Sequence, residues 1–531
     1  MLRLTTTALL GLALLPAGAL AAPTKIPQRE LAGSGTFRSA KIGVSPKDEA
    51  LVVIQQDDGT AKARLVTRVR GADGRFGQLQ EISRNAGALP PAEIRFNGAG
   101  ATLLGWTIAG DGTAAEKVFR PAGGLFSVPF GWLTPETCIR SVTVAFLPNG
   151  NATAACSKGA TGLGSDTEIV AMNGLSADGT SFDDAQVVQG AVTRRTVVAG
   201  SPRLEVAPDG RRALAWITNR TSDTPPFTTR TLWIAMAPPD QPFGAPRDIA
   251  SATDTLGFAD LTLGDLAILA DGRVVLIKGG SISAGISSNS YDVIGTDGIR
   301  AGGGSVSNSS GSSSGAQVER DGSGALVAWR ENSFTAGDNG LRVATIAPGS
   351  TTLSSKATLP GALNGSITNL EVTAGGAAVI AATVTAGSNR DLVGWTRAAA
   401  GRPFSSPVKF ATAPLSSLFD SSIDRHGSLI AAWSEGTSSI QLGGIDVRGP
   451  ALSSLSVPGR LRAGRSGTFS VSAVDPAGVK GIRWDFGDRS ATTGGRVGHS
   501  YRRAGRYRVT LVATDQAGQQ TRATRTVTVV R

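Results

Sequence analysis

A turn glycine followed by a short run of small and apolar residues recurs along most of this 531-residue chain. The clearest copy is "DGSGALVAW" at 321–329, in which the last five residues are all apolar. A strand with one face in water would alternate apolar and polar residues, so this strand must be buried on both faces. Aligned on the last strand position, eight copies end at Gln55, Trp106, Cys156, Trp216, Lys278, Trp329, Ala382 and Trp433. Successive copies are 50 to 62 residues apart, which indicates a repeat array.

Each repeat contains more than this one strand. A third apolar segment follows, and then a motif of Phe, often Pro, and an aliphatic residue, as in "QPFGAPRDI" at 241–249. Four short strands per repeat are typical of a β-propeller, whose blades are sandwiched between their neighbours. We therefore predict an all-β fold with an eight-bladed propeller over residues 22–449, similar to secreted bacterial β-propeller repeat proteins. Seven blades are the alternative if the fifth copy, Leu263 to Ser305, is an insertion, because it lacks the fourth motif.

The two ends of the array predict how the ring closes. The last copy, Ser421 to Arg448, has no fourth motif, whereas "TKIPQREL" at 24–31 resembles one. An open propeller would expose unpaired backbone groups at the edge of its last blade. We expect residues 24–31 to pair into that blade and join the two ends of the array.

The first 21 residues have the features of a secretory signal peptide. Arg3 precedes an apolar run from Ala8 to Leu15, and Ala19 and Ala21 are small residues at the positions that a signal peptidase reads. The run is too short to span a membrane, and no later run reaches the ~18 apolar residues of a transmembrane helix. We expect cleavage after Ala21 and a secreted, monomeric protein that is extracellular or associated with the cell surface.

The chain has two cysteines, Cys138 and Cys156. Two cysteines at this spacing in an oxidising compartment are often paired. A hairpin with its turn at residues 149–150 places Cys156 opposite Thr143, so Cys138 reaches Cys156 only if the chain folds back. A disulfide and two buried free thiols both remain open.

From residue 450 the composition changes. The segment contains "WDFGD" at 484–488, "HSY" at 499–501, "YRVTL" at 507–511 and "DQAG" at 515–518. In this order, the motifs resemble the PKD family of extracellular immunoglobulin-like β-sandwiches. The resemblance implies a spacer or ligand-binding module at residues 450–531 that carries no catalytic residues. Arg489 departs from the family, which usually has Gly after the Gly-Asp pair.

Most of the net positive charge lies in this C-terminal segment. Residues 451–531 contain 13 Arg and one Lys against four Asp, so they carry +10 of the total +11. Alternation in "RYRVTL" points Arg506 and Arg508 outward, and the family's strand order places Arg483 and Arg522 on the same sheet face. A basic face is typical of proteins that bind an anionic cell-wall polymer, an acidic polysaccharide or a nucleic acid. The alternative is a solvated face that binds nothing.

The sequence also allows an enzyme. Secreted propellers include sialidases, other glycoside hydrolases and lyases, and sialidases use a tyrosine nucleophile. The repeat region has one tyrosine, Tyr291, and one histidine, His426, and it has no Ser-x-Asp-x-Gly-x-Thr-Trp box. A pair of channel carboxylates would come from residues such as Glu93, Glu168 or Glu205.

Signals for other ligands are sparse. Acidic residues occur at 55–60 and 109–113, but Asp-Gly is ordinary turn chemistry, so we predict no metal site and no cofactor. Trp132 alone among the tryptophans has no place in the repeat or sandwich cores, and it is a candidate carbohydrate contact. We therefore predict a non-catalytic binding or cell-surface interaction protein whose propeller is a recognition scaffold. Its basic module would bind an anionic polymer, a polysaccharide or an extracellular protein; the alternative is a sialidase-like glycoside hydrolase or lyase with an accessory module.

Overall fold

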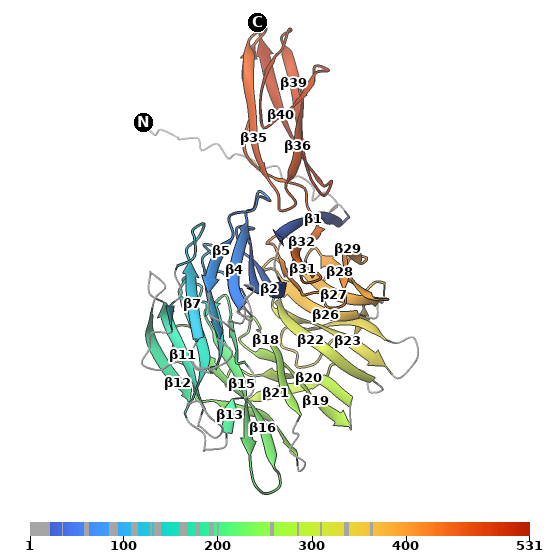
Figure 1. Cartoon of the computed structure of the whole chain (residues 1–531). Coiled ribbons are helices and arrows are strands. Elements are labelled where there is room, and N and C mark those ends of the chain that lie inside the picture. Colours follow the sequence, from blue (N-terminus) through green and yellow to red (C-terminus); the bar gives the residue numbers. More distant parts are fainter. Residues whose placement is uncertain are drawn as a thin grey trace, which may run out of the picture.

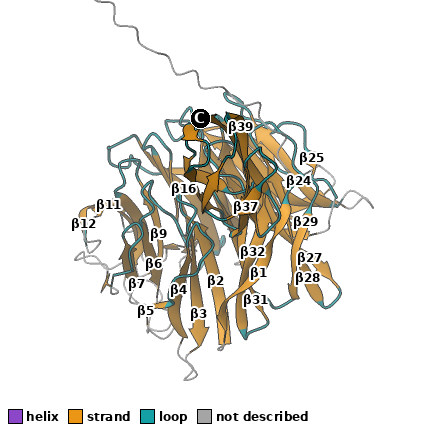
Figure 2. Ribbon diagram, turned by 90° about the horizontal axis from the view of Figure 1, so that it is seen from above, coloured by secondary structure: helices purple, strands orange, loops and turns teal. Residues whose placement is uncertain are grey.

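A computed structural model describes the chain in segments, and all of their regular secondary structure is β-strand (Figure 2). The described residues are 22–33, 36–57, 63–83, 94–107, 115–127, 130–131, 140–159, 167–175, 181–190, 196–198, 201–254, 260–283, 286–307, 311–333, 339–361 and 365–531. Within these segments, no helix is long and apolar enough to cross a membrane. The predicted signal peptide, 1–21, lies outside the described residues, so its cleavage stays a prediction.

The described strands before residue 450 form eight successive sheets, which we number as blades 1 to 8 (Figure 1). Blade 1 contains β2 (Thr36–Val44), β3 (Ala50–Asp57), β4 (Ala63–Arg70) and β5 (Gln80–Ser83). Blade 2 contains β6 (Thr102–Thr107), β7 (Ala115–Arg120) and β8 (Phe130–Gly131). Blade 3 contains β9 (Arg140–Phe146), β10 (Ala152–Gly159), β11 (Thr167–Leu175) and β12 (Phe182–Gln189). Blade 4 contains β13 (Thr196–Val198), β14 (Arg203–Val206), β15 (Arg212–Thr221), β16 (Thr228–Ala237) and β17 (Arg247–Asp254).

The second half of the array repeats the pattern. Blade 5 contains β18 (Leu261–Ile268), β19 (Val274–Ser283), β20 (Ile286–Ile294) and β21 (Arg300–Ser305). Blade 6 contains β22 (Gly311–Asp321), β23 (Gly324–Ser333), β24 (Gly340–Ile346) and β25 (Ala357–Thr358). Blade 7 contains β26 (Gly365–Val372), β27 (Ala378–Ala386), β28 (Asn389–Arg397) and β29 (Val408–Pro414). Blade 8 contains β30 (Phe419–Ile423), β31 (Leu429–Glu435), β32 (Ser439–Asp446) and the N-terminal β1 (Thr24–Gly33).

Apolar cores between consecutive blades close the ring. Each of the eight neighbouring pairs, including blades 8 and 1, shares one cluster of buried side chains. This arrangement confirms the eight-bladed propeller. The seven-bladed alternative is wrong, because the fifth copy forms a complete blade whose fourth strand, β21, is a glycine-rich segment without the Phe-Pro motif.

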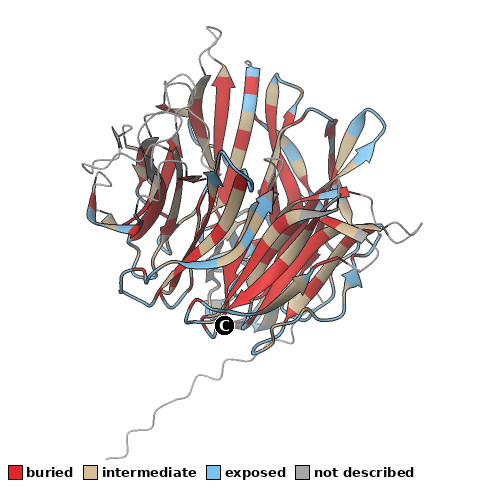
Figure 3. Cartoon of the chain, turned by 90° about the horizontal axis from the view of Figure 1, so that it is seen from below, coloured by how far each residue is buried: buried red, intermediate tan, exposed pale blue. Residues whose placement is uncertain are grey.

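The second strand of each blade shows why its sequence is apolar throughout. In β23, Ala325, Val327 and Trp329 pack against blade 5. Leu326 and Ala328, on the opposite face of β23, pack against blade 7. Because both faces of the sheet are covered by other sheets, alternation with polar residues is lost, and buried residues follow these strands (Figure 3).

The N-terminal strand pairs with the last blade as predicted. β1 is antiparallel to β32, from Thr24 opposite Asp446 to Gly33 opposite Ser439. Ile26 and Leu31 of β1 are buried in the core between blades 8 and 1. The two ends of the repeat array therefore meet in one sheet.

The C-terminal residues form a β-sandwich that stands on one side of the ring beside β1 and β32 (Figure 1). One sheet contains β33 (Ala451–Ser456), β35 (Ser466–Val474) and β38 (Arg496–Ser500). The other contains β34 (Arg460–Arg462), β36 (Val479–Asp485), β37 (Ala491–Thr493), β39 (Gly505–Asp515) and β40 (Gln520–Val530). Phe469, Trp484, Phe486 and Tyr501 fill the space between the two sheets.

Candidate functional site

The innermost strands of the propeller surround a central channel. Its cavity has a volume of about 620 Å³ and is lined by residues of blades 1, 2 and 4 to 8. The charged lining residues are Lys41, Arg95, Arg203, Glu205, Asp265, Glu319, Glu371 and Asp420. Among the described residues, five carboxyl groups and three cationic groups line the channel, a higher share of acids than in the basic chain as a whole.

Most of these carboxylates hold blades together. Asp265, Glu371 and Asp420 each accept a hydrogen bond from a backbone N–H of the next blade, at 3.1, 2.8 and 2.9 Å. Glu205 of blade 4 forms an ion pair of 2.8 Å with Arg95 of blade 2. These four carboxylates therefore form contacts between blades.

Glu319 is the channel carboxylate that differs. Burial raises its pKa well above the ordinary value, and the nearby charges of Glu205 and Asp265 raise it further. Among the described residues, none donates a hydrogen bond to the carboxylate of Glu319. Glu371 also has a raised pKa, of about 7, because burial outweighs the hydrogen bonds that it accepts.

The catalytic candidates of the sequence do not meet in this channel. Glu205 lines it, but Glu168 lies on β11, opposite Lys158, and Glu93 lies outside the described residues. Tyr291 is buried in the core between blades 5 and 6, where its hydroxyl accepts a hydrogen bond from the backbone N–H of Leu353 at 3.1 Å. A tyrosine in that position cannot reach a substrate in the channel.

Strand register places the four predicted arginines on one face of the five-stranded sheet. Arg483 of β36 and Arg522 of β40 both align with Val512 of β39. Arg506 and Arg508 lie on the same side of β39 as Val512, because side chains alternate along a strand. All four arginines are exposed. The outward placement that alternation predicted is thus present in the structure.

Two further arginines on this face were missed from the sequence. β34 pairs in parallel with β40, so that Arg460 aligns with Thr528, which in turn aligns with Arg506. Leu461 packs toward the sandwich core, and Arg460 and Arg462 therefore point outward. The alternation in "RLR" was the available signal, but a three-residue strand after Pro-Gly is too short to recognise. We call the six residues the arginine face: Arg460, Arg462, Arg483, Arg506, Arg508 and Arg522.

Few acids compensate this charge. Asp485 lies on the same side of the sheet, but among the described residues no carboxylate forms an ion pair with any of the six arginines. Asp488 instead contacts His499 at 2.9 Å, and Asp475 and Asp515 are buried next to the propeller. The arginine face therefore presents unneutralised guanidinium groups to solvent.

Two other predicted positions lie outside the described residues, namely Trp132 and Cys138. Cys156 is buried on β10 and is disulfide-bonded. In the β9–β10 hairpin Cys156 lies opposite Val142, whereas the sequence predicted Thr143. The register differs by one residue because the hairpin turn lies earlier in the chain than predicted. Cys138, the one other cysteine of the sequence, is not among the described residues, and the sugar contact of Trp132 stays a prediction. The acidic turns at 58–60 and 109–113 also lie outside the described residues.

A family comparison decides the nature of the sandwich, since residues 449–530 match the model of the PKD domain family. This sandwich is a PKD domain. Arg489, the departure from the family pattern, has a φ of 73°. The PKD domain thus keeps at this turn the left-handed backbone that glycine adopts most easily. No curated protein matches the sequence.

Solved structures with some similarity include three carbohydrate-related proteins. An ulvan lyase of polysaccharide lyase family PL25 is 10% identical, with a TM-score of 0.39 over 78% of this chain and 95% of that chain. The BP39L lectin from Burkholderia pseudomallei is 10% identical, with a TM-score of 0.42 over 71% and 99%. A Hadza microbial sialidase is 12% identical, with a TM-score of 0.33 over 75% and 76%. The propeller assignment rests on the order of strands in the eight sheets and on the eight cores between blades.

Proposed function

We propose that this protein is an exported, non-catalytic binding protein whose PKD domain binds an anionic polymer, with the propeller as the scaffold that presents it. The observation that carries the proposal is the arginine face, in which six exposed guanidinium groups share one sheet surface without an ion-paired acid among the described residues. A cell-wall polymer or an acidic polysaccharide supplies a matching row of negative charges.

The chemistry of arginine suits this role. A guanidinium group stays ionised at any physiological pH and donates paired hydrogen bonds to carboxylate, sulfate or phosphate groups. The sheet spaces neighbouring strands by ~4.8 Å and successive outward residues by ~7 Å, which produces a fixed lattice of charges. Multiple weak contacts on such a lattice add up along a polymer, whereas a small anion engages only one or two of them.

A glycan-cleaving propeller is the second candidate, and Glu319 is the observation that favours it. A general acid needs a raised pKa, and the pKa of Glu319 is raised in a solvent-accessible channel. Hydrolysis by two carboxylates would require a second free group. The other four channel carboxylates are bound to backbone N–H groups or to Arg95, so the geometry supports binding better than cleavage.

The test compares two variants of the full mature chain that lose the same charge. The face variant replaces four arginines by Ser, at Arg483, Arg506, Arg508 and Arg522. The control variant replaces four exposed arginines of the PKD domain outside the face by Ser, at Arg465, Arg496, Arg502 and Arg503. Binding is measured by interferometry on immobilised dextran sulfate, with neutral dextran as the reference surface.

We expect wild type and control to bind dextran sulfate and the face variant to lose at least tenfold in affinity. Binding should also weaken steeply from 0.05 to 0.5 M NaCl, because the Debye length falls to ~4 Å. Equal losses of affinity in the face variant and the control variant would show that net charge alone determines binding. That result would contradict a specific role of the arginine face. Equal binding to neutral dextran would contradict the anionic ligand.

A further inference from the structure

A row of threonines runs along β40 within the arginine face. Thr524, Thr526 and Thr528 alternate with inward residues such as Val527, which is buried in the sandwich core. Because side chains alternate along a strand, the three threonines point outward, on the same side of the sheet as Arg522. Thr526 and Thr528 are exposed, and Thr524 is half-buried. We call these three residues the threonine row.

Arginines stand on both sides of this row. On β39, Arg508 aligns with Thr526 and Arg506 aligns with Thr528. On β34, Arg460 also aligns with Thr528, on the opposite side of β40. Thr528 therefore lies between two arginines, each one strand spacing of ~4.8 Å away. Because an arginine side chain is longer than a threonine side chain, the three strands form a groove with a threonine floor and arginine walls.

A hollow of about 480 Å³ lies over part of this groove. Its lining residues are Arg506, Tyr507, Arg508, Thr524, Arg525 and Thr526. The four even-numbered residues of this set point outward, so the hollow opens on the arginine face. The outward positions of β40 from Arg522 to Thr528 extend over ~20 Å, at ~3.4 Å per residue. The groove is therefore suited to a linear polymer rather than to a small anion.

The hydroxyl groups of the threonine row are available to a ligand. Among the described residues, none forms a hydrogen bond with the side chain of Thr524, Thr526 or Thr528. A threonine hydroxyl both donates and accepts hydrogen bonds, whereas a guanidinium group only donates. The arginines thus supply donors for anionic groups. The threonines add acceptors, which a ligand can use only if it has donors of its own.

Aromatic side chains do not occur on this face within the described part of the chain. Tyr507 lies on the inward side of β39, where its ring stacks on Tyr501 with 4.2 Å between the centroids. Proteins that bind single-stranded nucleic acids stack the bases on exposed aromatic rings. The groove therefore favours a polyanion without bases.

We propose that the groove binds a linear acidic polysaccharide that lies along β40. The arginine walls would contact its carboxylate or sulfate groups, and the threonine row would form hydrogen bonds with its sugar hydroxyls. This inference rests on the proposed function, in which the PKD domain binds an anionic polymer, and it names the class of that polymer. A polyanion without hydroxyl groups, such as inorganic polyphosphate, would contact the arginines alone.

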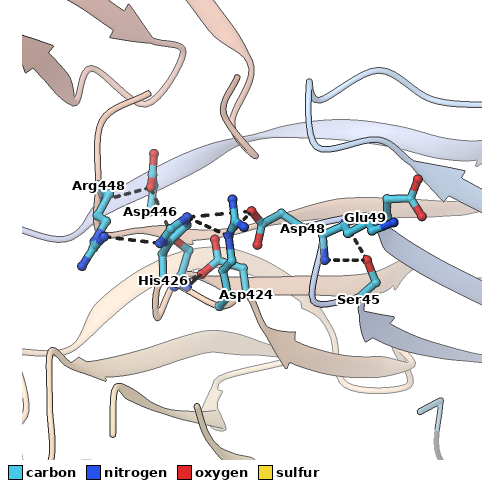
Figure 4. A network of polar contacts seen from close by, with 10 residues as sticks. Ser45, Asp48, Glu49, Asp424, His426, Asp446 and Arg448 are labelled. Carbon is cyan, nitrogen blue, oxygen red and sulfur yellow. Dashed lines mark hydrogen bonds and ion pairs between the residues drawn. The ribbon is translucent and has the colours of Figure 1, made fainter. Parts of the chain in front are cut away.

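The PKD domain is tested within the full mature chain, because its base is attached to the propeller. Figure 4 shows Arg448, just before the PKD domain, with its backbone N–H donating to Asp446 at 3.1 Å and its guanidinium group 3.3 Å from His426. Thr526 and Thr528 lie near the far end of β40, ~20 Å or more along the strand from this junction. Substitutions in the threonine row therefore leave the junction unchanged.

The test variant replaces Thr526 and Thr528 by Val, which keeps the shape and the strand propensity of threonine and removes only the hydroxyl groups. The control variant is Thr468→Val with Thr492→Val. Both control residues are exposed in the PKD domain and lie outside the face, Thr468 on β35 and Thr492 opposite the inward Trp484. Affinity is measured by interferometry on immobilised chondroitin sulfate and on inorganic polyphosphate at one salt concentration.

We expect the test variant to bind chondroitin sulfate roughly tenfold more weakly than wild type, because hydrogen bonds to the sugar are lost, and to bind polyphosphate within about twofold of wild type. The control variant should match wild type on both polymers. Thr526→Ser with Thr528→Ser keeps the hydroxyl groups and should also bind both polymers like wild type. Melting temperatures of all variants check that the domain is folded.

Unchanged binding of chondroitin sulfate by the test variant would overturn the inference. An equal loss of affinity for both polymers would overturn it as well, because the hydroxyl groups would then not distinguish a sugar. The face variant, measured in parallel, separates this inference from the proposed function. If the face variant keeps its affinity for both polymers, the proposed function fails; if it loses both while the test variant loses neither, only the inference fails.

Discussion

At the residue scale, Trp329 shows what one side chain contributes to a blade interface. Its ring is completely buried between blades 5 and 6, and its Nε1–H donates a hydrogen bond to Glu331 at 2.8 Å. Replacing Trp329 with Ala leaves a cavity and removes a donor from a buried carboxylate. We expect this change to lower the free energy of unfolding by ~3 to 5 kcal/mol in urea denaturation. Trp329→Phe keeps most of the side-chain volume and should lower the free energy of unfolding clearly less. A free energy of unfolding that is unchanged in Trp329→Ala would contradict the burial of this side chain between blades.

Glu371 predicts a pH dependence of stability. Its pKa is about 7 in the folded protein against an ordinary value of 4.5, so the folded state binds the proton more tightly. Its stabilising contribution is complete below pH 4.5 and is lost as the pH rises through 7. Glu371→Gln cannot ionise and escapes this loss.

The difference in melting temperature, Glu371→Gln minus wild type, should therefore increase from pH 5 to pH 8. Glu30→Gln, at an exposed residue of β1, is the control for the loss of one carboxyl group from the chain. A difference for Glu371→Gln that is constant or decreases with pH would show that the carboxyl group is already ionised in the folded protein at pH 5.

Single residues also mark the limit of sequence reasoning. Period-two alternation was sufficient to point Arg506 and Arg508 outward, because it depends only on the strand itself. The same reasoning does not predict that Asp446, Asp475 and Asp515 lie within 4.8 Å of one another, since Asp446 is 29 residues from Asp475 and 69 from Asp515. Each of the three occupies an ordinary loop position after a strand, and only the docking of one domain on the other brings them together.

At the element scale, the strands that repeat were predictable and the strands that occur once were not. The apolar run of β23 is one of eight copies, so its pattern is reinforced by its equivalents. β21 is rich in glycine and β34 has three residues, and both gain their strand conformation from neighbours that a local pattern does not contain. Strand register is limited in the same way. The turn between β9 and β10 lies one position from its predicted place, so Cys156 pairs with Val142 and not with Thr143.

At the scale of the whole molecule, the ring and the PKD domain were predictable, and their relative placement was not. Counting strands was enough to show that the last blade lacked one and that the N-terminus supplied it. The junction instead depends on short loops, such as those carrying Ala477 and Gln519, whose sequences have no pattern that names a partner. The predictable features are those that the chain repeats or shares with a family.

Ring closure by β1 leads to the last prediction. Deleting residues 22–33 removes the partner strand of β32 and the buried side chains Ile26 and Leu31, and it leaves the outer edge of blade 8 unpaired. We expect a lower melting temperature, measured by differential scanning calorimetry, and concentration-dependent aggregation, because an exposed strand edge pairs with other chains.

A variant that keeps the strand separates this effect from a general sensitivity of the N-terminus. Lys25→Ala with Glu30→Ala alters only exposed side chains of β1 and should melt like wild type. Loss of the strand should also weaken the PKD domain junction, since Gln519 bonds to Ala22 and Thr24. Protease cleavage near residue 449 should then become faster in the deletion variant alone. Unchanged melting of the deletion variant would mean that the ring of eight blades is stable without its N-terminal strand, and that the cores between blades, rather than the shared sheet, close it.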